Sequence, residues 1–462
     1  MHKHVPGLSE ADAFLNAHSD VVAVDMLLPD MNGILRGKQL GRDYVHKLYD
    51  EGVRLPGSNY LLDWTGQNVT TLDYGTSDGD PDYFCFAVPE TLKPVPWGAR
   101  PTGQVLASMY HEDGTPFFAD PRNVLQRALK PLTDMGLTPV IAIEYEFYLI
   151  DREAAARGVV QPAIGPRSQF RPAQTNVYGL DDLYDFEDVL SAIHEACDIQ
   201  RLPAETFVAE YAPGQFEINL HHVDSALLAC DQAILLERCI KQVARRHDMI
   251  ATFMAKPFAE SAGSGLHVHV SLLDRHGNNV LAGPFDERLN RPVGDMLRHA
   301  IGGLVATMPE AMAIFAPNAN SYRRLKPGTY APVKANWGGD NRTVSLRIPG
   351  SDERSVRVEH RVAGADANPY LVVAAVLAGM HHGIVNEIEP HDPVVGDGYE
   401  QDAPDLPIRW PVALERFTEG TVLGRYFGED YVRAFATARQ FECDNFHYQI
   451  QPLDYQWYLR TA

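Results

Sequence analysis

The sequence has no long hydrophobic run and no apolar leader. Its longest apolar run, residues 370–380, is shorter than the roughly 18 residues that suggest a membrane-spanning helix. Residues 1–14, MHKHVPGLSEADAF, lack the uninterrupted apolar core of a secretory signal. These absences predict a soluble, cytoplasmic protein that does not bind membranes.

Basic residues are scarce relative to acidic ones. The chain has 40 Lys and Arg against 61 Asp and Glu, a formal net charge of −21. A chain with this charge and no basic block repels the phosphates of nucleic acids at long range, so nucleic-acid binding is not expected.

Cysteines are few and form no CxxC pair. Their odd number and scattered positions argue against a disulfide framework or a zinc ribbon, and we expect buried thiols. The five positions are Cys85, Cys197, Cys230, Cys239 and Cys443.

With 462 residues, 45% of them hydrophobic, the chain is long enough for two or three domains. Up to about residue 100, short β-rich runs at 21–28 and 60–64 alternate with Gly, Pro and Asp clusters. Beyond them, helices are expected at 121–136, 181–200, 225–247 and 368–383, with one final helix near the C-terminus. The pattern predicts an α+β protein with a small domain at residues 1–112 and a larger one at 113–462.

The segment PVIAIEYEFYLI, residues 139–150, is predicted to be a strand with two different faces. Its period of two places Ile143 and Tyr145 on one face and Glu144 and Glu146 on the other. Carboxylates in an apolar strand are costly unless a cation is near. The alternative is a solvated sheet face.

The segment FVAEYAPGQFEINL supplies two more carboxylates around a Pro213-Gly214 turn. In a tight hairpin, Glu210 and Glu217 would lie opposite each other, and like charges in such a pair are destabilising unless a cation lies between them. A solvated hairpin is the alternative.

In GSGLHVHVSL, His267, His269 and Ser271 share one strand face, and the glycines allow a ligand to approach the backbone. Two later segments place polar side chains on one face in the same way, unless the second is a surface ladder of ion pairs. They contain Thr343, Ser345 and Arg347, and Arg357, Glu359 and Arg361.

Several strands thus combine an apolar face with a face of Glu, His, Ser or Arg, as strands that line a cleft do. Oxygen ligands with few imidazoles suit Mg²⁺ or Mn²⁺, and arginines favour carboxylate and phosphate ligands. The residues alone therefore predict a two-metal enzyme that handles phosphate, although the chain lacks a GxxxxGK[ST] loop.

These segments resemble the motifs of the glutamine synthetase family. The similar stretches are residues 144–147, 210–217, 263–271, 341–349 and 357–370. The resemblance implies a small N-terminal β-grasp domain, residues 1–112. It also implies a C-terminal catalytic domain, residues 113–462, with a curved antiparallel sheet flanked by helices.

The resemblance also implies a site with two or three Mg²⁺ or Mn²⁺ ions per subunit and ATP as a substrate. One metal would be held by Glu146, Glu210 and Glu217, and a second by Glu144, His267 and Glu359. The positions matching glutamate contacts are Gly263, Arg324 and Arg361. The positions matching ATP contacts are Glu205, His269, Ser271, Arg347 and Arg357. Arg342 matches the arginine that meets the transferred phosphate.

The implied reaction is phosphorylation of the γ-carboxylate of L-glutamate by ATP, followed by attack of a nitrogen nucleophile on the γ-glutamyl phosphate. Ammonia-using members carry a glutamate in the flap and an aspartate in a DGSS loop, where this chain has Tyr330 and Pro56. Ala262 replaces an asparagine that contacts the substrate amino group. Without the flap glutamate and the DGSS-loop aspartate, the attraction for NH₄⁺ is weaker and there is room for a bulkier nucleophile.

These departures make the chain similar to the γ-glutamylpolyamine synthetases, above all γ-glutamylputrescine synthetase. The nucleophile would be a primary amine such as putrescine, taken in amine catabolism and nitrogen assimilation. Asp63 is a candidate partner for the distal ammonium, or a structural hydrogen-bond acceptor. Tyr330 is a candidate base, although an unperturbed Tyr pKa of about 10 makes it a weak one at neutral pH.

Three other functions remain open at this point. The first is a ligase for a monoamine such as ethanolamine or isopropylamine, the second an ammonia-using glutamine synthetase, and the third a member without activity. The resemblance further implies a homo-oligomer, a dodecamer of two stacked hexameric rings, with sites formed between neighbouring subunits.

Overall fold

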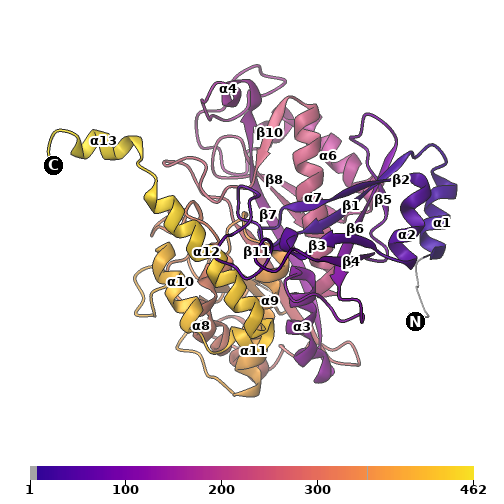
Figure 1. The fold of residues 1–462 in the computed structure, drawn as a ribbon. Coiled ribbons are helices and arrows are strands. Elements are labelled where there is room, and N and C mark those ends of the chain that lie inside the picture. Colours follow the sequence, from indigo (N-terminus) through magenta and orange to yellow (C-terminus); the bar gives the residue numbers. More distant parts are fainter. Residues whose placement is uncertain (1–7, 351) are drawn as a thin grey trace.

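The computed structural model describes residues 8–350 and 352–462. An N-terminal sheet of six strands has the order β2-β1-β6-β4-β3, with β5 paired to β6 (Figure 1). Its strands are β1 Ala23–Pro29, β2 Leu35–Gly41, β3 Val53–Pro56, β4 Asp82–Ala87, β5 Lys93–Pro94 and β6 Thr102–Tyr110. The helices α1 Leu8–Ala17 and α2 Val45–Asp50 accompany it.

A second sheet of eight strands carries the site. Its order is β14-β15-β16-β11-β7-β9-β8, with β10 paired to β7. The strands are β7 Thr138–Asp151, β8 Ala204–Ala209, β9 Gln215–Leu220, β10 Met249–Thr252, β11 Leu266–Leu273, β14 Trp337–Gly338, β15 Leu346–Arg347 and β16 Val358–His360. Its pairs are antiparallel apart from β14 and β15. A separate short pair joins β12 Phe285–Asp286 and β13 Arg291–Pro292.

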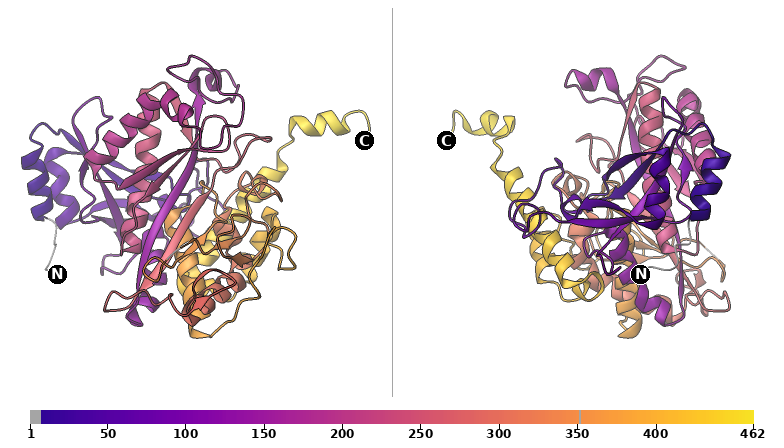
Figure 2. Two further views of the ribbon diagram at one scale, coloured as in Figure 1. Left: turned by 180° about the vertical axis from the view of Figure 1, so that it is seen from behind. Right: turned by 45° about the vertical axis from the view of Figure 1, so that its right-hand side comes forward.

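Helices account for most of the rest of the described chain. They are α3 Pro121–Asp134, α4 Arg152–Ala156, α5 Leu180–Asp185, α6 Glu187–Gln200, α7 Ala226–Arg246, α8 Asp295–Phe315, α9 Pro369–Val385, α10 Trp410–Glu419, α11 Leu423–Phe427, α12 Glu429–Tyr448 and α13 Pro452–Tyr458. Helices α8 to α12 gather in one cluster, and α13 projects beyond it (Figure 2). In the described ranges, no helix has both the length and the apolar character needed to cross a membrane.

The predicted helix starts are confirmed by their caps. The side chains of Asp120, Ser225 and Asn368 accept hydrogen bonds from the backbone N–H groups at the starts of α3, α7 and α9. All five cysteines are free and buried, as expected.

Three predicted elements are wrong or incomplete. Residues 60–64 form no strand, because Tyr60 ends the 3₁₀ helix η2, Gly57–Tyr60, and turns follow it. The predicted helix at 181–200 is broken at Phe186, which separates α5 from α6. The C-terminal region contains α10 to α13 rather than one final helix.

Strand β7 has the two faces that its sequence predicts. Ile141, Ile143, Tyr145 and Phe147 are at most 1% exposed and belong to the main hydrophobic core. The opposite face carries Glu144 and Glu146, so the packing of the core side fixes the direction of both carboxylates. The domain boundary at residue 112 remains our proposal; it falls between β6 and β7.

Candidate active site

Strand pairing brings the acidic and histidine side chains of three strands together. Glu144 of β7 lies opposite His267 of β11, and Glu146 lies opposite Glu217 of β9. The predicted opposition of Glu210 and Glu217 is wrong. Glu217 pairs with Val208 in β8, because Glu210 lies beyond the end of that strand.

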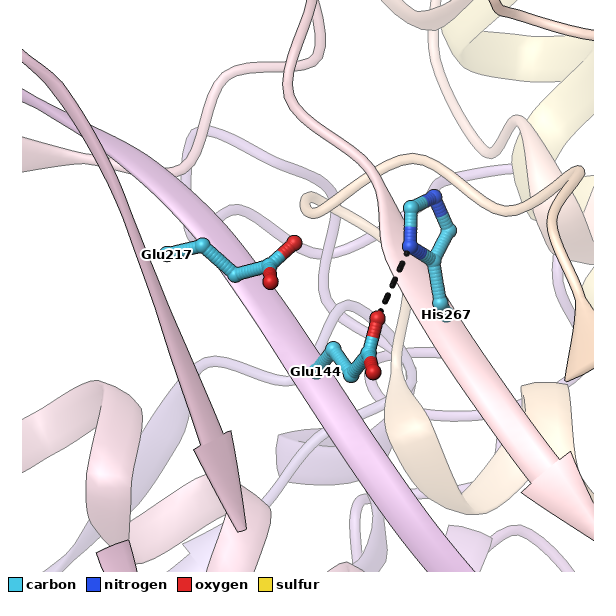
Figure 3. A group of neighbouring side chains, drawn as sticks. All are labelled: Glu144, Glu217 and His267. Carbon is cyan, nitrogen blue, oxygen red and sulfur yellow. Dashed lines mark hydrogen bonds and ion pairs between the residues drawn. The ribbon is translucent and has the colours of Figure 1, made fainter. Parts of the chain in front are cut away.

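Seven side chains form three overlapping groups, and within each group the possible ligand atoms lie within 4.8 Å of one another. The groups are Glu146, Glu210 and Glu217; Glu144, Glu217 and His267; and Glu144, His269 and Glu359. Figure 3 shows the second group, in which Glu144 and Glu217 extend from neighbouring strands and His267 comes from β11. All six side chains expected to bind metal are thus in this cluster.

The grouping around the expected second metal differs in detail from the prediction. Nδ1 of His267 lies 3.2 Å from Glu144 and 3.9 Å from Glu359. However, His269 also approaches Glu144, at 2.9 Å, and it is His269 that shares a compact group with Glu359. The structure therefore places His269, expected at the nucleotide, within reach of the same carboxylates.

Three carboxylates of the cluster resist ionisation. Burial and the neighbouring Glu144, Glu146 and Glu210 raise the pKa of Glu217 to about 10. Burial and Glu210 raise the pKa of Glu146 to about 7, against the opposing effect of Arg324. Burial also raises the pKa of Glu210. A divalent cation would relieve this repulsion between like charges.

The histidine side of the cluster behaves differently. Burial, followed by the charge of Arg361, lowers the pKa of His267 to about 4, so its imidazole is neutral and can act as a ligand. Burial opposes ionisation of Glu144, but hydrogen bonds with His267 and His269 outweigh burial and lower its pKa. Carboxylate oxygens with a neutral imidazole are a donor set that fits Mg²⁺ or Mn²⁺.

Glu359 is a buried member of an ion-pair network. It is 1% exposed, accepts from Arg347 at 2.7 Å and pairs with Arg361. Burial alone would raise its pKa, but Arg361 leads the effects that lower it to about 2. A surface ladder of ion pairs is therefore excluded here.

The residues expected at glutamate are also close together. Arg324 is 5% exposed, and its guanidinium donates to the carbonyls of Val362 at 2.8 Å and Arg361 at 3.3 Å. A Cβ atom on Gly263 would lie 2.7 Å from Cγ of Arg324, so glycine is needed for this approach. Gln215, not expected from the sequence, donates to the Gly263 carbonyl at 3.0 Å.

The positions expected at ATP are more spread out. Nε of Arg357 donates to His269 at 3.2 Å, and Ser271 follows on the same strand face. Glu205 is exposed and contacts Nδ1 of His221 at 2.7 Å. Arg342 is exposed, and its charge lowers the pKa of Glu210, partly offsetting burial.

Tyr330 and Asp63 are outside the groups of metal ligands. Tyr330 is 56% exposed and has a left-handed backbone, with φ of 56°. Oδ1 of Asp63 accepts from the N–H groups of Thr65 and Gln67, at 2.8 and 2.9 Å. Asp63 also lines a cavity of about 970 Å³ that no residue of the metal cluster lines. These contacts fit the structural role proposed for Asp63.

Tyr178 is a neighbour of the carboxylates that the sequence does not predict. Its backbone N–H donates to Ala209 at 3.0 Å, beside the end of β8 and Glu210. Burial and then Glu210 raise the pKa of its phenol. Its segment has no regular period, so no sequence pattern indicates that Tyr178 lies near the carboxylates.

Comparison with known proteins agrees with this geometry. Residues 118–458 match the glutamine synthetase catalytic domain. The chain is 43% identical over 453 residues to gamma-glutamylputrescine synthetase PuuA of Escherichia coli, covering 98% of this chain and 95% of that protein. It is 35% identical over 422 residues to glutamate–isopropylamine ligase of a Pseudomonas species, covering 89% of each. It also resembles the solved GmaS/ADP complex, with a TM-score of 0.83, 26% identity and coverage of 97% and 98%. The chain belongs to the glutamine synthetase family.

Proposed function

We propose that this protein is an ATP-dependent ligase that joins the γ-carboxylate of L-glutamate to a primary amine, with putrescine or another polyamine as its substrate. The observation that carries this proposal is the cluster of Glu and His side chains on β7, β9, β11 and β16, in the fold of glutamate–amine ligases. Both named relatives are synthetases or ligases of this type, and the solved relative binds ADP.

The residues of the cluster divide the work of the reaction. Glu146, Glu210 and Glu217 would hold one Mg²⁺ or Mn²⁺, and Glu144, His267 and Glu359 a second, with His269 as a further neighbour. When bound, these ions supply positive charge that offsets the charge on ATP and on the phosphoryl group. A third ion per subunit is compatible with the overlapping groups.

The arginines hold the anionic substrates. Arg324 and Arg361, with Gly263, bind glutamate and keep its γ-carboxylate directed at ATP. Arg342 meets the phosphoryl group as it is transferred. The ATP contacts are Glu205, His269, Ser271, Arg347 and Arg357.

The nucleophile is an amine rather than ammonia because the flap and the N-terminal loop lack the two anions that attract NH₄⁺. Tyr330 and Pro56 stand in their places. Tyr330 borders the amine position and is the candidate base.

A monoamine substrate is the second candidate, and one observation favours it. The Asp63 carboxylate is engaged by its own loop, through Thr65 and Gln67. An anion held in this way is less available to a distal ammonium group. The relationship to an isopropylamine ligase is in line with this alternative.

We also propose that the protein is a cytoplasmic homo-oligomer, a dodecamer of two stacked hexameric rings. The projecting helix α13 supports self-association, because several large apolar residues on and around it are exposed. They are Tyr448, Ile450, Leu453, Tyr455, Trp457, Tyr458 and Leu459. ATP dependence favours the cytoplasm.

The test is phosphate release with ATP, Mg²⁺ and glutamate against ammonia, putrescine, spermidine, ethanolamine and isopropylamine, with mass detection of the product. We expect turnover with diamines and little with ammonia, and a Tyr330→Glu variant should gain ammonia-dependent activity. A preference for monoamines would support the second candidate. If ammonia proved the best substrate, the role given to Tyr330 and Pro56 would be wrong.

A further inference from the structure

The loop that carries Arg324 is held by a carboxylate that is not part of the metal cluster. Asp366 lies in the turn between β16 and α9. Its Oδ2 accepts hydrogen bonds from Nδ2 of Asn318 and from the hydroxyl of Ser321, each at 2.8 Å. Asn318 lies between α8 and the 3₁₀ helix η3, Ser321–Arg323, and Ser321 begins that 3₁₀ helix.

Ser321 connects this carboxylate to Arg324. The backbone carbonyl of Ser321 accepts from the N–H of Arg324 at 3.1 Å. Asn318 braces the same turn, since its Oδ1 accepts from the N–H of Asn320 at 2.9 Å and from that of Ser321 at 3.3 Å. The backbone of Arg324 is therefore tied to Asp366 through one residue.

The guanidinium of Arg324 is tied to the same stretch of chain from the other side. It donates to the carbonyls of Arg361 and Val362, which precede Asp366. The Gly364 N–H donates to Phe315 at 3.0 Å, and the Ala365 N–H to Ser264 at 3.0 Å. Residues 361–366 thus form a brace between the loop of Arg324 and the glycine-containing segment 263–265 that precedes β11.

The position of the Asp366 side chain depends on Gly364. A Cβ atom on Gly364 would lie 2.5 Å from Oδ1 of Asp366 and 3.0 Å from Cβ of Ala255, so a side chain there would displace the carboxylate. Within the described residues, this buried oxygen has no hydrogen-bond donor. An unpaired buried carboxylate oxygen is unfavourable, and the other oxygen of Asp366 binds two donors of the loop. This combination indicates that the Asp366 side chain has a role in holding the loop.

We infer that Asp366 is a positioning residue for substrate glutamate, which it serves by holding Asn318 and Ser321 and, through them, Arg324. This inference rests on the proposed function, in which Arg324 binds glutamate. The hydrogen bonds of the Asp366 side chain go to neither the metal cluster nor the expected ATP residues, so we expect its loss to affect glutamate more than ATP.

The test compares Asp366→Ala with Asp366→Asn in steady-state kinetics. Alanine removes the acceptor of both hydrogen bonds, so the KM for glutamate should rise about tenfold while the KM for ATP stays within about twofold. Asparagine keeps an acceptor oxygen and should restore most of the glutamate affinity. Gly364→Ala, which displaces the carboxylate, should resemble Asp366→Ala.

Glu310→Ala is the matched control. Glu310 lies on α8 and accepts from the N–H groups of Leu423 and Val422, at 2.7 and 3.1 Å. The loss of the Glu310 carboxylate should lower the melting temperature, but it should not raise the KM for glutamate relative to the KM for ATP. Equal changes in both KM values in Asp366→Ala, or an unchanged KM for glutamate, would overturn the inference.

A second measurement does not depend on activity. Hydrogen exchange at residues 318–326 should be faster in Asp366→Ala than in the unmodified protein and unchanged in Glu310→Ala. If the unmodified protein shows no glutamate-dependent turnover, the proposed function fails, and exchange alone then decides whether Asp366 holds the loop. Unchanged exchange in Asp366→Ala would contradict the inference.

Discussion

At the scale of single residues, the site is built from carboxylates that oppose one another's ionisation. Glu146 and Glu217 are directly paired across β7 and β9, and Glu144 is next to both. Two facing anions are destabilising in a sheet unless a cation lies between them. This arrangement therefore lowers the stability of the metal-free protein, and it provides a site where a cation can bind.

The identity of these residues could be predicted from the sequence, because alternation in β7 and β11 assigns each side chain to a face. The partner of Glu217 could not. The pairing register of β8 and β9 depends on where the turn between them begins and ends. Glu210 lies just beyond the end of β8, so Val208 rather than Glu210 pairs with Glu217. Asp366 and Tyr178 were also missed because their roles arise from contacts between segments distant in the chain.

Removing one carboxylate tests this balance. The raised pKa of Glu217 means that the folded, metal-free protein holds this proton more tightly than the unfolded chain. The stabilising contribution of this proton is present below the ordinary Glu pKa of 4.5 and is lost as the pH rises toward about 10. In EDTA, the melting temperature should fall between pH 6 and pH 9, and Glu217→Gln should reduce that fall by roughly 5 °C.

Mg²⁺ provides the control for this measurement. The metal binds the ionised carboxylates, so it should stabilise the unmodified protein more at pH 9 than at pH 6, and Glu217→Gln should lose most of this gain. If the melting temperatures of both proteins depended on pH in the same way in EDTA, the pKa of Glu217 would not be raised by its surroundings.

At the scale of elements, starts of helices are predictable and interruptions are not. Asp120, Ser225 and Asn368 mark their helices by local chemistry that the sequence shows directly. The break at Phe186 is different, because this side chain is 1% exposed and packs on Phe216 of β9. Tertiary packing of one aromatic ring decides where α5 ends.

Asp120 also joins elements, which makes its effect larger than that of a simple cap. It is fully buried and accepts from the N–H of Arg122 at 2.9 Å, the N–H of Met109 at 3.0 Å and the hydroxyl of Tyr60 at 3.1 Å. Asp120→Ala should lower the free energy of unfolding by about 2–4 kcal/mol, because buried donors lose their acceptor.

Asp113→Ala is the control for this prediction. Asp113 also accepts from a backbone N–H, that of Thr115 at 2.9 Å, but it lies in an exposed turn. Thermal unfolding should show a large decrease for Asp120→Ala and little change for Asp113→Ala. Equal decreases would mean that burial and the contacts with β6 and Tyr60 add nothing to the local cap.

At the scale of the whole molecule, buried and partly buried polar contacts join the region of β1 to the helices α7 and α9. Nδ2 of Asn368, at the start of α9, donates to the carbonyl of Asp30 at 2.8 Å, and Arg238 of α7 pairs with Asp25 of β1 at 2.5 Å. The α+β class could be predicted from the sequence. The course of α13 could not, because this helix projects from the rest of the described chain (Figure 1) and its direction is not set by a regular pattern in the sequence.

Removing residues 450–462, the projecting C-terminal arm that contains α13, tests whether its apolar residues serve assembly. Ile450 is 68% exposed, Trp457 60% and Leu459 73%, which is unfavourable for a segment in contact with water alone. A variant ending at Gln449 should form a smaller assembly than the full chain, measured by light scattering and native mass spectrometry. Because the arm contributes nothing to the main hydrophobic core, the melting temperature of the truncated subunit should change little at concentrations where both proteins are dissociated.

A matched variant with Trp457→Ser and Leu459→Ser should weaken assembly in the same direction. An unchanged mass for both variants would show that the subunits associate through other surfaces.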